Sequence, residues 1–491
     1  MHPQLAAALV LLSSAAVLVL EVLVSRLVAP YVGLTLETYT ASIGVALGAI
    51  AAGAALGGRL ADAVDPRRWL GPALALGGAL LLLARPTVFA LGPDLPRGPY
   101  ATVILVTAAV GPSVLVLSTV TPGVVKLRLR TLAETGATVG RLSALGTLGA
   151  LAGTFLTGFF LLSALPVSRV LLAVGLLLVV LGLVLAVRLP RSGPEPRVGS
   201  EALGALALVG ALAAALLVAA DGSCDRETRY YCASVVADPS LESGRTLVLD
   251  GLQHSYVDLA DPAHLEFSYT QRFGDVLAAL PPGPVDVLHL GLGGGTFPRH
   301  VAQVRPGSRS RVLEVDPGVL AIDRDRLGLV TGPDLEVVVG DARTAIAAEP
   351  TASYDVVVGD AFGSLAVPWH LTTREMVAQV RRVLRPGGTY VLNVIDNPPN
   401  AFAAAEAATL VDAFDHVVAL GSPAQRAGRV GGNFVLAASD RPVPHDALLR
   451  LAGERGSSDA PWDGRELAGD AAVLTDDDAP VDQLLTPYPS A

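Results

Sequence analysis

Seven long apolar stretches fill the first 220 residues of this 491-residue chain, and they limit its fold more than any other feature. The stretches span about residues 5–29, 39–58, 69–92, 101–121, 140–163, 167–187 and 203–220. A helix needs about 20 apolar residues to cross the roughly 30 Å of hydrocarbon in a bilayer. Glu21 and Arg26 interrupt the first stretch and other stretches follow it, which argues against a cleaved signal peptide. Residues 1–220 are therefore predicted to form an all-α, polytopic membrane domain with about seven transmembrane helices.

Basic residues predict how these helices are oriented. They gather in the loops after the second, fourth and sixth stretches: Arg59, Arg67, Arg68, Lys126, Arg128, Arg130, Arg141, Arg188, Arg191 and Arg197. Because cytoplasmic loops are enriched in Lys and Arg, these loops and the N-terminus are expected in the cytoplasm. With an odd number of spans, the rest of the chain is then expected on the outer side of the cell membrane.

Glycines within the second stretch predict close helix packing. Gly44 and Gly48 are four positions apart, as are Gly53 and Gly57, so each pair falls on one helix face. Small residues at this spacing let two helix backbones approach one another.

The residues after position 220 differ from the membrane part in charge. Residues 1–220 hold 14 basic and 8 acidic side chains, whereas the remainder holds 21 basic and 37 acidic ones. Such an acidic part repels phosphates, so nucleic acid is excluded as an expected partner. Its charge favours cationic small molecules or serves solubility. Cys224 and Cys232, eight positions apart, are either a disulfide of an oxidising compartment or two unrelated thiols.

Short strands alternate with helices from about residue 221 onward. Strands at 245–250 and 255–259, joined by a turn at Gly251, predict a small β-rich lid over 221–282. Further strands are predicted at 285–290, 310–315, 335–339, 355–359, 390–394, 416–420 and 432–437. Helices are predicted between them at 297–304, 319–327, 342–348 and 373–384. This alternation predicts a Rossmann-like α/β domain over 283–491, built on a parallel sheet.

A glycine-rich loop follows the first of these strands, in Gly291-Leu-Gly293-Gly-Gly295-Thr296. Glycine permits the sharp turn and the close backbone approach that a nucleotide-sized ligand requires. Thr296 stands where a dinucleotide fingerprint would have glycine, so the loop alone does not identify a cofactor.

Three acids follow later strands of the same sheet. Glu314 ends the second strand, where a carboxylate can accept both hydroxyls of a ribose, and Asp341 follows the third, where it can accept from an adenine amino group. Asp360 ends the fourth strand. Glu314 or Asp341 alone is equally compatible with a solvated loop acid. Because ligands of such sheets bind at the carboxyl ends of the strands, the ordered set predicts one adenosine-sized crevice.

Residues about 227–440 resemble the spermidine synthase family, the polyamine aminopropyltransferases, of the bacterial type fused to a multi-spanning membrane domain. The matching segments are Glu227–Tyr231, Leu249–Gln253 of the lid hairpin, Tyr269, Val312–Asp316, Gly340–Ala342 and Asp360. The resemblance implies a methyltransferase-type Rossmann-like fold. It also implies a membrane-bound enzyme that transfers an aminopropyl group from decarboxylated S-adenosylmethionine to an amine such as putrescine.

The resemblance also implies roles for individual residues. Asp360 is the expected catalytic residue, and Gln253 and Tyr269 are the expected substrate-binding residues. The expected cofactor-binding residues are Gly291, Gly293, Gly295, Glu314, Asp341 and Ala342, and no metal is expected. Two positions depart from the family pattern, since Gly294 and Gly363 stand where the family has aspartates that hold amines.

Two other functions fit the same residues. A methyltransferase that uses S-adenosylmethionine itself is compatible with the absence of those two acids. A non-catalytic sensor or transporter that binds polyamines or nucleosides is compatible with a domain outside the cytoplasm. The expected partners are a polyamine or other small amine and the lipid bilayer, and a homo-oligomer is left open.

Overall fold

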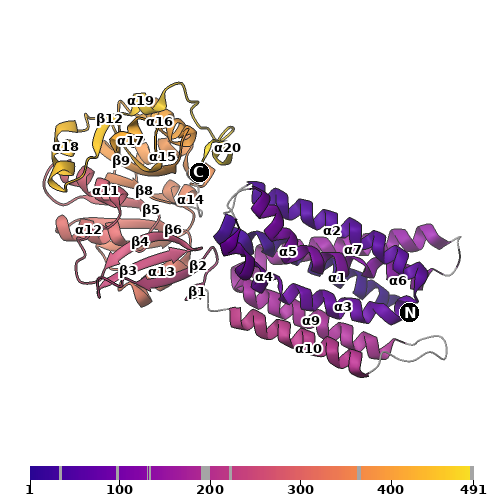
Figure 1. The fold of residues 1–491 in the computed structure, drawn as a ribbon. Helices are drawn as coiled ribbons and strands as arrows, with labels where there is room; N and C mark the ends of the chain where they lie inside the picture. The colour runs from indigo at the N-terminus through magenta and orange to yellow at the C-terminus, as the bar shows by residue number, and fades with distance from the viewer. Residues whose placement is uncertain are drawn as a thin grey trace. The chain divides into compact units, whose positions relative to one another are not determined.

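The computed structural model describes residues 1–32, 36–95, 99–129, 131, 134–189, 200–220, 224–361 and 367–486 (Figure 1). Arg130, Arg191, Arg197 and Gly363, named above, lie outside these ranges. The chain divides into two compact units, Met1–Arg229 and Tyr230–Ala491, which are described separately below.

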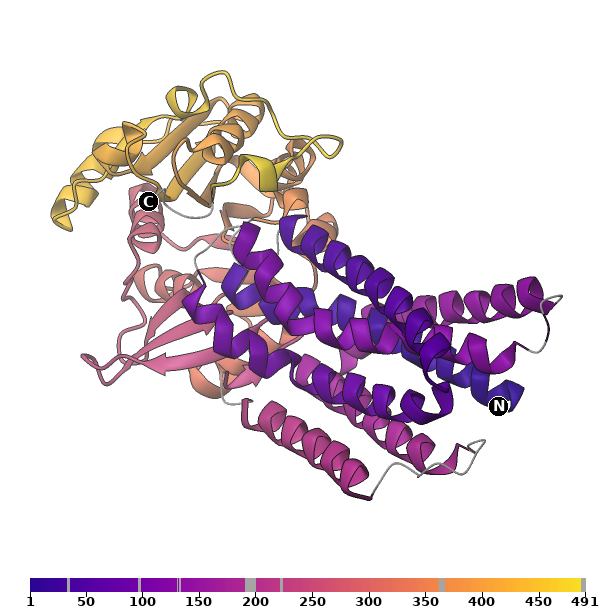
Figure 2. The same ribbon diagram turned by 45° about the vertical axis from the view of Figure 1, so that its right-hand side comes forward.

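The first unit is helical, with long helices that run side by side in both views (Figures 1 and 2). Its helices are α1 (Pro3–Val32), α2 (Leu36–Ala63), α3 (Pro66–Leu82), α4 (Ala84–Leu91), α5 (Pro99–Ser118), α6 (Val120–Arg128), α7 (Thr135–Phe155), α8 (Leu162–Ala164), α9 (Val167–Arg188) and α10 (Ser200–Ala219). The shorter elements are η1 (Gly92–Asp94), the π-helical turn η3 (Leu156–Leu161) and strand β1 (Arg226–Glu227).

Six helical segments of the described chain are long and apolar enough to cross a membrane. They are Pro3–Val32, Leu36–Ala63, Tyr100–Arg128, Thr135–Leu161, Val167–Arg188 and Ala202–Ala219. The third predicted stretch is a bent pair instead, in which α3 and the segment Ala84–Asp94 meet at 40°. If this pair counts as one broken span, the number rises to seven.

The two predicted glycine pairs of α2 differ in their surroundings. A Cβ built on Gly53 would overlap the Leu115 carbonyl of α5, and one on Gly57 would lie 2.6 Å from the Cα of Thr119. These two glycines therefore do allow close packing. Among the described residues, no atom lies within 4 Å of a Cβ built on Gly44 or Gly48, so the prediction of close packing was wrong for that pair.

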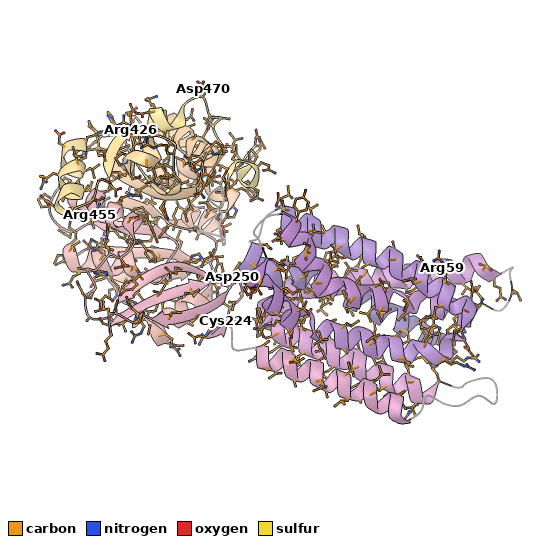
Figure 3. The ribbon with its side chains drawn as sticks, viewed as in Figure 1. Arg59, Cys224, Asp250, Arg426, Arg455 and Asp470 are labelled. Atoms are coloured by element: carbon orange, nitrogen blue, oxygen red, sulfur yellow. The ribbon has the colours of Figure 1, made fainter. Side chains whose placement is uncertain are left out.

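The second unit begins with a small antiparallel sheet of β2 (Cys232–Ala237), β3 (Gly244–Leu249) and β4 (Leu252–Asp258). Asp250, labelled in Figure 3, and Gly251 join β3 to β4 with positive φ angles of 50° and 78°. Two such residues form the tight hairpin turn that the twist of antiparallel strands favours. Cys224 and Cys232 are both disulfide-bonded, which answers the question that the sequence left open.

An eight-stranded sheet forms the centre of the second unit, in the order β12-β10-β11-β9-β8-β5-β6-β7. Its strands are β5 (Asp286–Leu290), β6 (Arg309–Glu314), β7 (Leu335–Val339), β8 (Tyr354–Gly359), β9 (Leu384–Asp396), β10 (His416–Gly421), β11 (Gly432–Ser439) and β12 (Ala460–Asp463). Strands β7, β6, β5, β8 and β9 are parallel, as predicted. The sheet as a whole is mixed, because β10, β11 and β12 pair antiparallel. The connection between β10 and β11 is too short for the crossover that parallel neighbours require.

Helices cover both faces of this sheet. They are α11 (Ser268–Ala279), α12 (Thr296–Val304), α13 (Pro317–Arg326), α14 (Ala342–Ala345), η5 (Ile346–Ala348), η6 (Trp369–Leu371), α15 (Arg374–Val383), α16 (Ala401–Ala413), α17 (Pro423–Arg426), α18 (His445–Glu454), α19 (Gly464–Ala468) and α20 (Val481–Leu484). Val356 and Val358 of β8 belong to the core cluster with α11 and α12, whereas Val357 belongs to the cluster with α15 and α16. Alternate side chains are thus buried on opposite faces, which explains the continuous apolar runs of these strands.

Strand order reverses at β5. The chain proceeds from β5 to β6 and β7 on one side, and returns to β8 and β9 on the other. The loops at the carboxyl ends of β5, β6 and β8 diverge at such a reversal, which is where open α/β sheets bind their ligands.

Candidate functional site

The glycine loop follows β5 and passes very close to neighbouring backbone. Gly291 has φ +98°, and a Cβ built on it would lie 2.5 Å from the carbonyl oxygen of Asp360. Gly293 and Gly295 also have positive φ angles, of 53° and 68°, and Gly295 precedes the first residue of α12. The lid strand β4 holds the loop, because the Gly294 N–H donates to Ser255 Oγ at 2.9 Å.

A cavity of about 720 Å³ opens at the carboxyl ends of β5, β6, β7 and β8. This volume is typical of small-molecule sites. Of the residues predicted from the sequence, the cavity is lined by Gln253, Tyr269, Gly291, Gly293, Glu314, Asp341, Ala342 and Asp360. Gly295 is not among the described lining residues and serves the entry into α12.

Glu314 ends β6 with its carboxylate buried and bonded to backbone. One oxygen accepts the Leu292 N–H at 2.9 Å and the other accepts the Asp316 N–H at 2.7 Å. Burial raises the pKa of this carboxyl to about 7, and the nearby Asp316 adds to the rise while the backbone N–H groups oppose it. The carboxylate therefore ties the glycine loop to the end of β6, and each oxygen keeps a second lone pair for a ligand.

Asp341 follows β7 and begins α14. Its Oδ1 accepts the Thr344 N–H at 3.2 Å, which caps the helix, and its Oδ2 lies 3.0 Å from His370 Nε2. His370 lines the cavity from η6. The Asp341 side chain is thus held by two partners at the predicted adenine end.

Asp360 follows β8, and its partly buried side chain lines the cavity. Its Oδ1 accepts a hydrogen bond from Asn393 Nδ2 at 2.9 Å. Burial raises the pKa of Asp360 to about 6, although hydrogen bonds from Asn393 and Tyr269 oppose the rise. The same surroundings, burial first and then the Asp360 charge, raise the pKa of the Tyr269 hydroxyl well above its usual value. A carboxylate of this kind is suited to accept a proton near neutral pH.

Several other residues that line the cavity were not predicted. Asn393 and Asn433 belong to β9 and β11, and His254 and Ser255 belong to the lid strand β4. Burial lowers the pKa of His254 to about 4, so this imidazole is neutral at physiological pH. The two asparagines had a sequence signal, since each is a polar residue beside an apolar strand run, in Val391-Leu-Asn393-Val394 and Asn433-Phe-Val-Leu436.

Gly294, one of the two departures from the family pattern, is not among the described residues that line the cavity. A Cβ built on it would lie 3.0 Å from the Cβ of Ser255 and 3.2 Å from Cγ2 of Val257. A larger side chain at this position would have to displace the lid strand.

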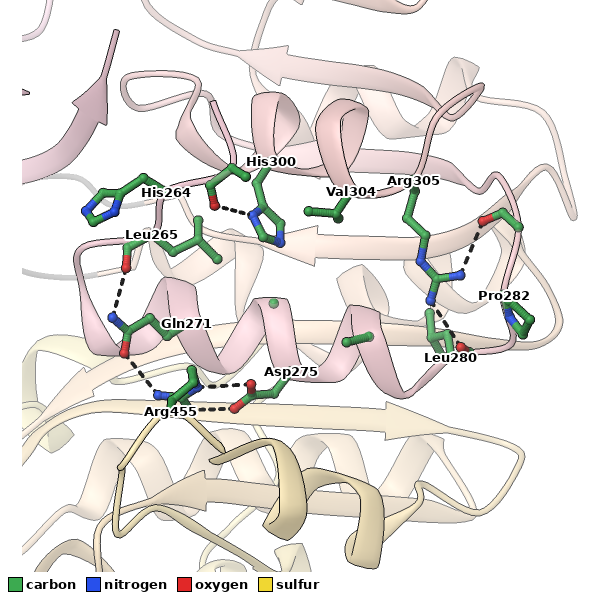
Figure 4. A pocket seen from close by; sticks show the side chains of 14 residues that line it. His264, Leu265, Gln271, Asp275, Leu280, Pro282, His300, Val304, Arg305 and Arg455 are labelled. Carbon is green, nitrogen blue, oxygen red and sulfur yellow. Dashed lines mark hydrogen bonds and ion pairs between the residues drawn. The ribbon is translucent and has the colours of Figure 1, made fainter. Parts of the chain in front are cut away.

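A second hollow of about 970 Å³ lies along α11 and α12, away from the glycine loop (Figure 4). Its charged groups are engaged within the protein. Arg305 donates to four backbone carbonyls, among them that of Leu277 at 2.6 Å. Arg455 forms two hydrogen bonds with the Asp275 carboxylate and a third with Gln271. Arg305 thus stabilises the C-terminal end of α11 and Arg455 binds to its side, so the smaller cavity is the better candidate site.

Comparisons with known proteins agree with this geometry. The family described as "Methyltransferase domain" matches residues 287–388, which include the glycine loop and all three acids. A polyamine aminopropyltransferase of Vibrio vulnificus is 34% identical over 114 residues, which cover 23% of this chain and 38% of that protein. A polyamine aminopropyltransferase of Mycobacterium tuberculosis is 31% identical over 285 residues, which cover 53% of this chain and 52% of that protein. The chain thus spans about half the length, or less, of these curated relatives.

Among solved structures, a probable spermidine synthase from Corynebacterium glutamicum is 28% identical. Its superposition has a TM-score of 0.49 and covers 51% of this chain and 95% of that one.

Proposed function

We propose that the second unit is an aminopropyltransferase, which moves an aminopropyl group from decarboxylated S-adenosylmethionine to a small amine such as putrescine. The observation that carries the proposal is one cavity at the strand reversal that unites the glycine loop, Glu314, Asp341 and Asp360. The relatives named polyamine aminopropyltransferases support the same assignment.

The donor's adenosine part would occupy the side of the cavity formed by β5, β6 and β7. Gly291 and Gly293 leave room for a ligand beside the backbone. The free lone pairs of Glu314 can accept the ribose hydroxyls, and the Asp341 carboxylate can accept from the adenine amino group. No metal is needed for this arrangement.

The acceptor's nitrogen would bind beside Asp360. A primary aliphatic amine resembles the lysine side chain, whose pKa is about 10.4, so it is protonated near neutral pH and cannot attack. Asp360, with its pKa of about 6, is largely ionised at pH 7 and can accept the ammonium's proton. The neutral nitrogen then forms a bond to the aminopropyl carbon, and the electron pair of the breaking C–S bond passes to the sulfonium sulfur. The products are the extended amine and neutral methylthioadenosine.

Charge placement and alignment would supply the acceleration. An ionised Asp360 offsets the repulsion between the ammonium and the sulfonium. Proton acceptance by a positioned carboxylate is worth about 10²–10⁴-fold in rate. In-line alignment of nitrogen, carbon and sulfur in the closed cavity would add the remainder.

A second candidate is methyl transfer from S-adenosylmethionine itself. The match of residues 287–388 to a methyltransferase domain favours it. The two functions differ in the donor and in the group transferred.

We also propose that the chain is a multi-pass protein of the cell membrane, with Tyr230–Ala491 outside the cytoplasm. Six apolar helices and one bent pair support seven spans, and the basic loops support a cytoplasmic N-terminus. The disulfide-bonded state of Cys224 and Cys232 supports an oxidising compartment.

The test is turnover by the full-length protein purified in detergent. The protein is incubated with putrescine and either decarboxylated S-adenosylmethionine or S-adenosylmethionine, and the nucleoside and amine products are measured by mass spectrometry. Methylthioadenosine and spermidine from the decarboxylated donor, lost in Asp360→Asn, are the expected result. S-adenosylhomocysteine from the intact donor would favour the methyltransferase. Polyamine binding without turnover of either donor would contradict both enzymatic proposals.

A further inference from the structure

Asp360 is the end of a chain of hydrogen bonds between side chains of the sheet. Asn393 Nδ2 donates to Asp360 Oδ1 at 2.9 Å, and Asn433 Nδ2 donates to Asn393 Oδ1 at 3.0 Å. Strand register explains the contacts. Gly359, just before Asp360, pairs with Leu392, and β9 pairs in turn with β11, where Val435 lies opposite Asn393.

The hydrogen bond from Asn433 fixes the orientation of the Asn393 amide. An amide has a donor end and an acceptor end. Because Asn433 donates to the oxygen of Asn393, the NH₂ group of Asn393 faces Asp360. A rotation of the Asn393 amide by 180° would place oxygen against the Asp360 carboxylate and NH₂ against NH₂, which breaks both hydrogen bonds.

Asn433 is held in turn by a buried ion pair. Its backbone carbonyl accepts from Arg272 Nη1 at 2.6 Å and from Gln425 Nε2 at 3.0 Å. Arg272 also donates to both carboxylate oxygens of Asp459, at 2.8 and 2.9 Å. Arg272 and Asp459 are only 5% and 7% exposed, so this bidentate pair forms a rigid base for the asparagine chain.

We infer that Asn393 and Asn433 are positioning residues that keep Asp360 ionised and hold its carboxylate toward the acceptor amine. The inference rests on the proposed function, in which the protonated acceptor amine needs an ionised carboxylate to take its proton. An N–H donated to a carboxylate stabilises the charged form, so loss of the Asn393 donor favours the protonated form of Asp360.

Other titratable groups face the same cavity and stay unchanged in the test. Among the described residues, Tyr269 of α11 is the titratable side chain that bonds to Asp360. The remaining lining groups are the Tyr230–Tyr231 pair, His254, Glu266, Glu314, Asp341 and His370. None of these is altered by the substitutions below.

The test is an infrared pH titration of the Asp360 carboxyl in the full-length protein in detergent, with the band assigned by its loss in Asp360→Asn. Asn393→Leu is close in size and lacks the donor. We expect its midpoint to rise by about one pH unit, a tenfold gain in proton affinity. In Asn433→Ser the side chain is too short to reach Asn393, so we expect a smaller rise in the Asp360 midpoint. This second variant provides the test if Asn393→Leu does not fold.

Asn397→Leu is the matched control. Asn397 is also a buried asparagine, 6% exposed, but its Nδ2 donates to the Thr486 carbonyl instead. We expect this control to lower thermal stability without a change in the Asp360 midpoint. Unchanged midpoints in both Asn393→Leu and Asn433→Ser would overturn the inference.

The titration requires no turnover, so it separates this inference from the proposed function. Where turnover is found, the acid limb of kcat/KM should move by the same amount as the midpoint. A shifted midpoint in a protein without turnover would contradict the aminopropyltransferase proposal and leave the role of the two asparagines toward Asp360 intact.

Discussion

At the scale of single residues, the candidate site contains an ionisable group and a backbone conformation that are energetically unfavourable. Asp360 is partly buried, which disfavours its charged form, and the hydrogen bonds from Asn393 and Tyr269 oppose that effect. Gly291 has a backbone conformation that residues with a side chain rarely adopt. The disfavoured charge of Asp360 and the backbone conformation of Gly291 each lead to a prediction.

Replacement of Asp360 by Asn should stabilise the protein while it abolishes activity. The pKa of Asp360 rises from 3.8 to about 6 on folding, so the folded protein binds more protons between these pH values. Its stability therefore falls as pH rises through this window, by up to about 3 kcal/mol. Thermal unfolding of Asp360→Asn at pH 7.5 should show a higher midpoint than the parent, with a smaller difference at pH 4. A lower midpoint at pH 7.5 would contradict the burial argument.

Alanine at Gly291 should damage the site more than alanine at Gly294. At position 291 the new Cβ requires a φ of +98° and would lie 2.5 Å from the Asp360 carbonyl oxygen. The expected loss of stability is on the order of 1–3 kcal/mol, with weaker binding of methylthioadenosine. At position 294 φ is ordinary and the nearest atom is a side-chain carbon at 3.0 Å. Thermal unfolding and calorimetric binding of methylthioadenosine measure both effects, and equal losses would count against the loop geometry.

At the scale of elements, antiparallel strands added to a parallel sheet complete the site. Asn393 lies on β9 at the edge of the parallel part, and Asn433 lies on β11, the first antiparallel strand. Helix α11 supplies Tyr269, which lines the cavity, and Arg272, which donates a hydrogen bond to the backbone of β11. Its buried face therefore contacts both Asp360 and strand β11.

The buried ion pair of α11 should be far more important for stability than an exposed pair of the same type. Arg272→Met removes both hydrogen bonds to the buried Asp459 carboxylate and leaves it the more distant Arg455, at 4.0 Å, which should cost about 3–5 kcal/mol. Arg426 and Glu466 are about half exposed, so Arg426→Met should change stability little. Chemical denaturation monitored by tryptophan fluorescence compares the two variants. Similar costs would show that the buried pair is not the base of the asparagine chain.

At the scale of the whole molecule, a helical unit and an α/β unit share one chain but bury different surfaces. The core of the first unit consists almost entirely of Leu, Val and Ala. Long helices such as α2 and α7 leave most of their apolar windows exposed, with 22% and 17% buried. Such exposed apolar surface is expected to face lipid. The acidic second unit has its own cores on both faces of its sheet.

Cysteine labelling should place the second unit outside the cytoplasm. Intact cells are treated with an impermeant phosphine to reduce the disulfide, and then with an impermeant maleimide. Cys224 and Cys232 should react in intact cells, and only after reduction. Reaction of the native pair only after lysis would reverse the proposed orientation.

The matched control for this labelling carries its cysteine on the opposite side of the membrane. Both native cysteines are replaced by serine, and Arg59→Cys introduces a single thiol near the end of α2 that is predicted to be cytoplasmic. We expect this thiol to react with the maleimide only after lysis, because the reagent does not cross the membrane. Reaction in intact cells would show that the basic loops are not cytoplasmic.

Much of the fold follows from local patterns. The apolar stretches, the alternation of strands and helices from β5 to β9 and the turn at Gly251 were predicted because periodicity and turn chemistry act over short distances. The predictions failed where the structure depends on contacts with residues distant in the sequence. The direction of β10 and β11 depends on how the chain returns to the sheet, and the packing of Gly44 and Gly48 depends on which helix lies opposite.

The sequence by itself determined which residues end the parallel strands, because hydrophobic runs terminate at the glycine loop, Glu314, Asp341 and Asp360. Only the tertiary structure decided what surrounds them. Arg272 and Asp459, 187 residues apart, form an ion pair next to β11, while Asn393 of β9 donates to Asp360 and Asn433 of β11 donates to Asn393. Such contacts arise from strand register and helix placement, which bring distant segments together and leave no periodic signal in the chain.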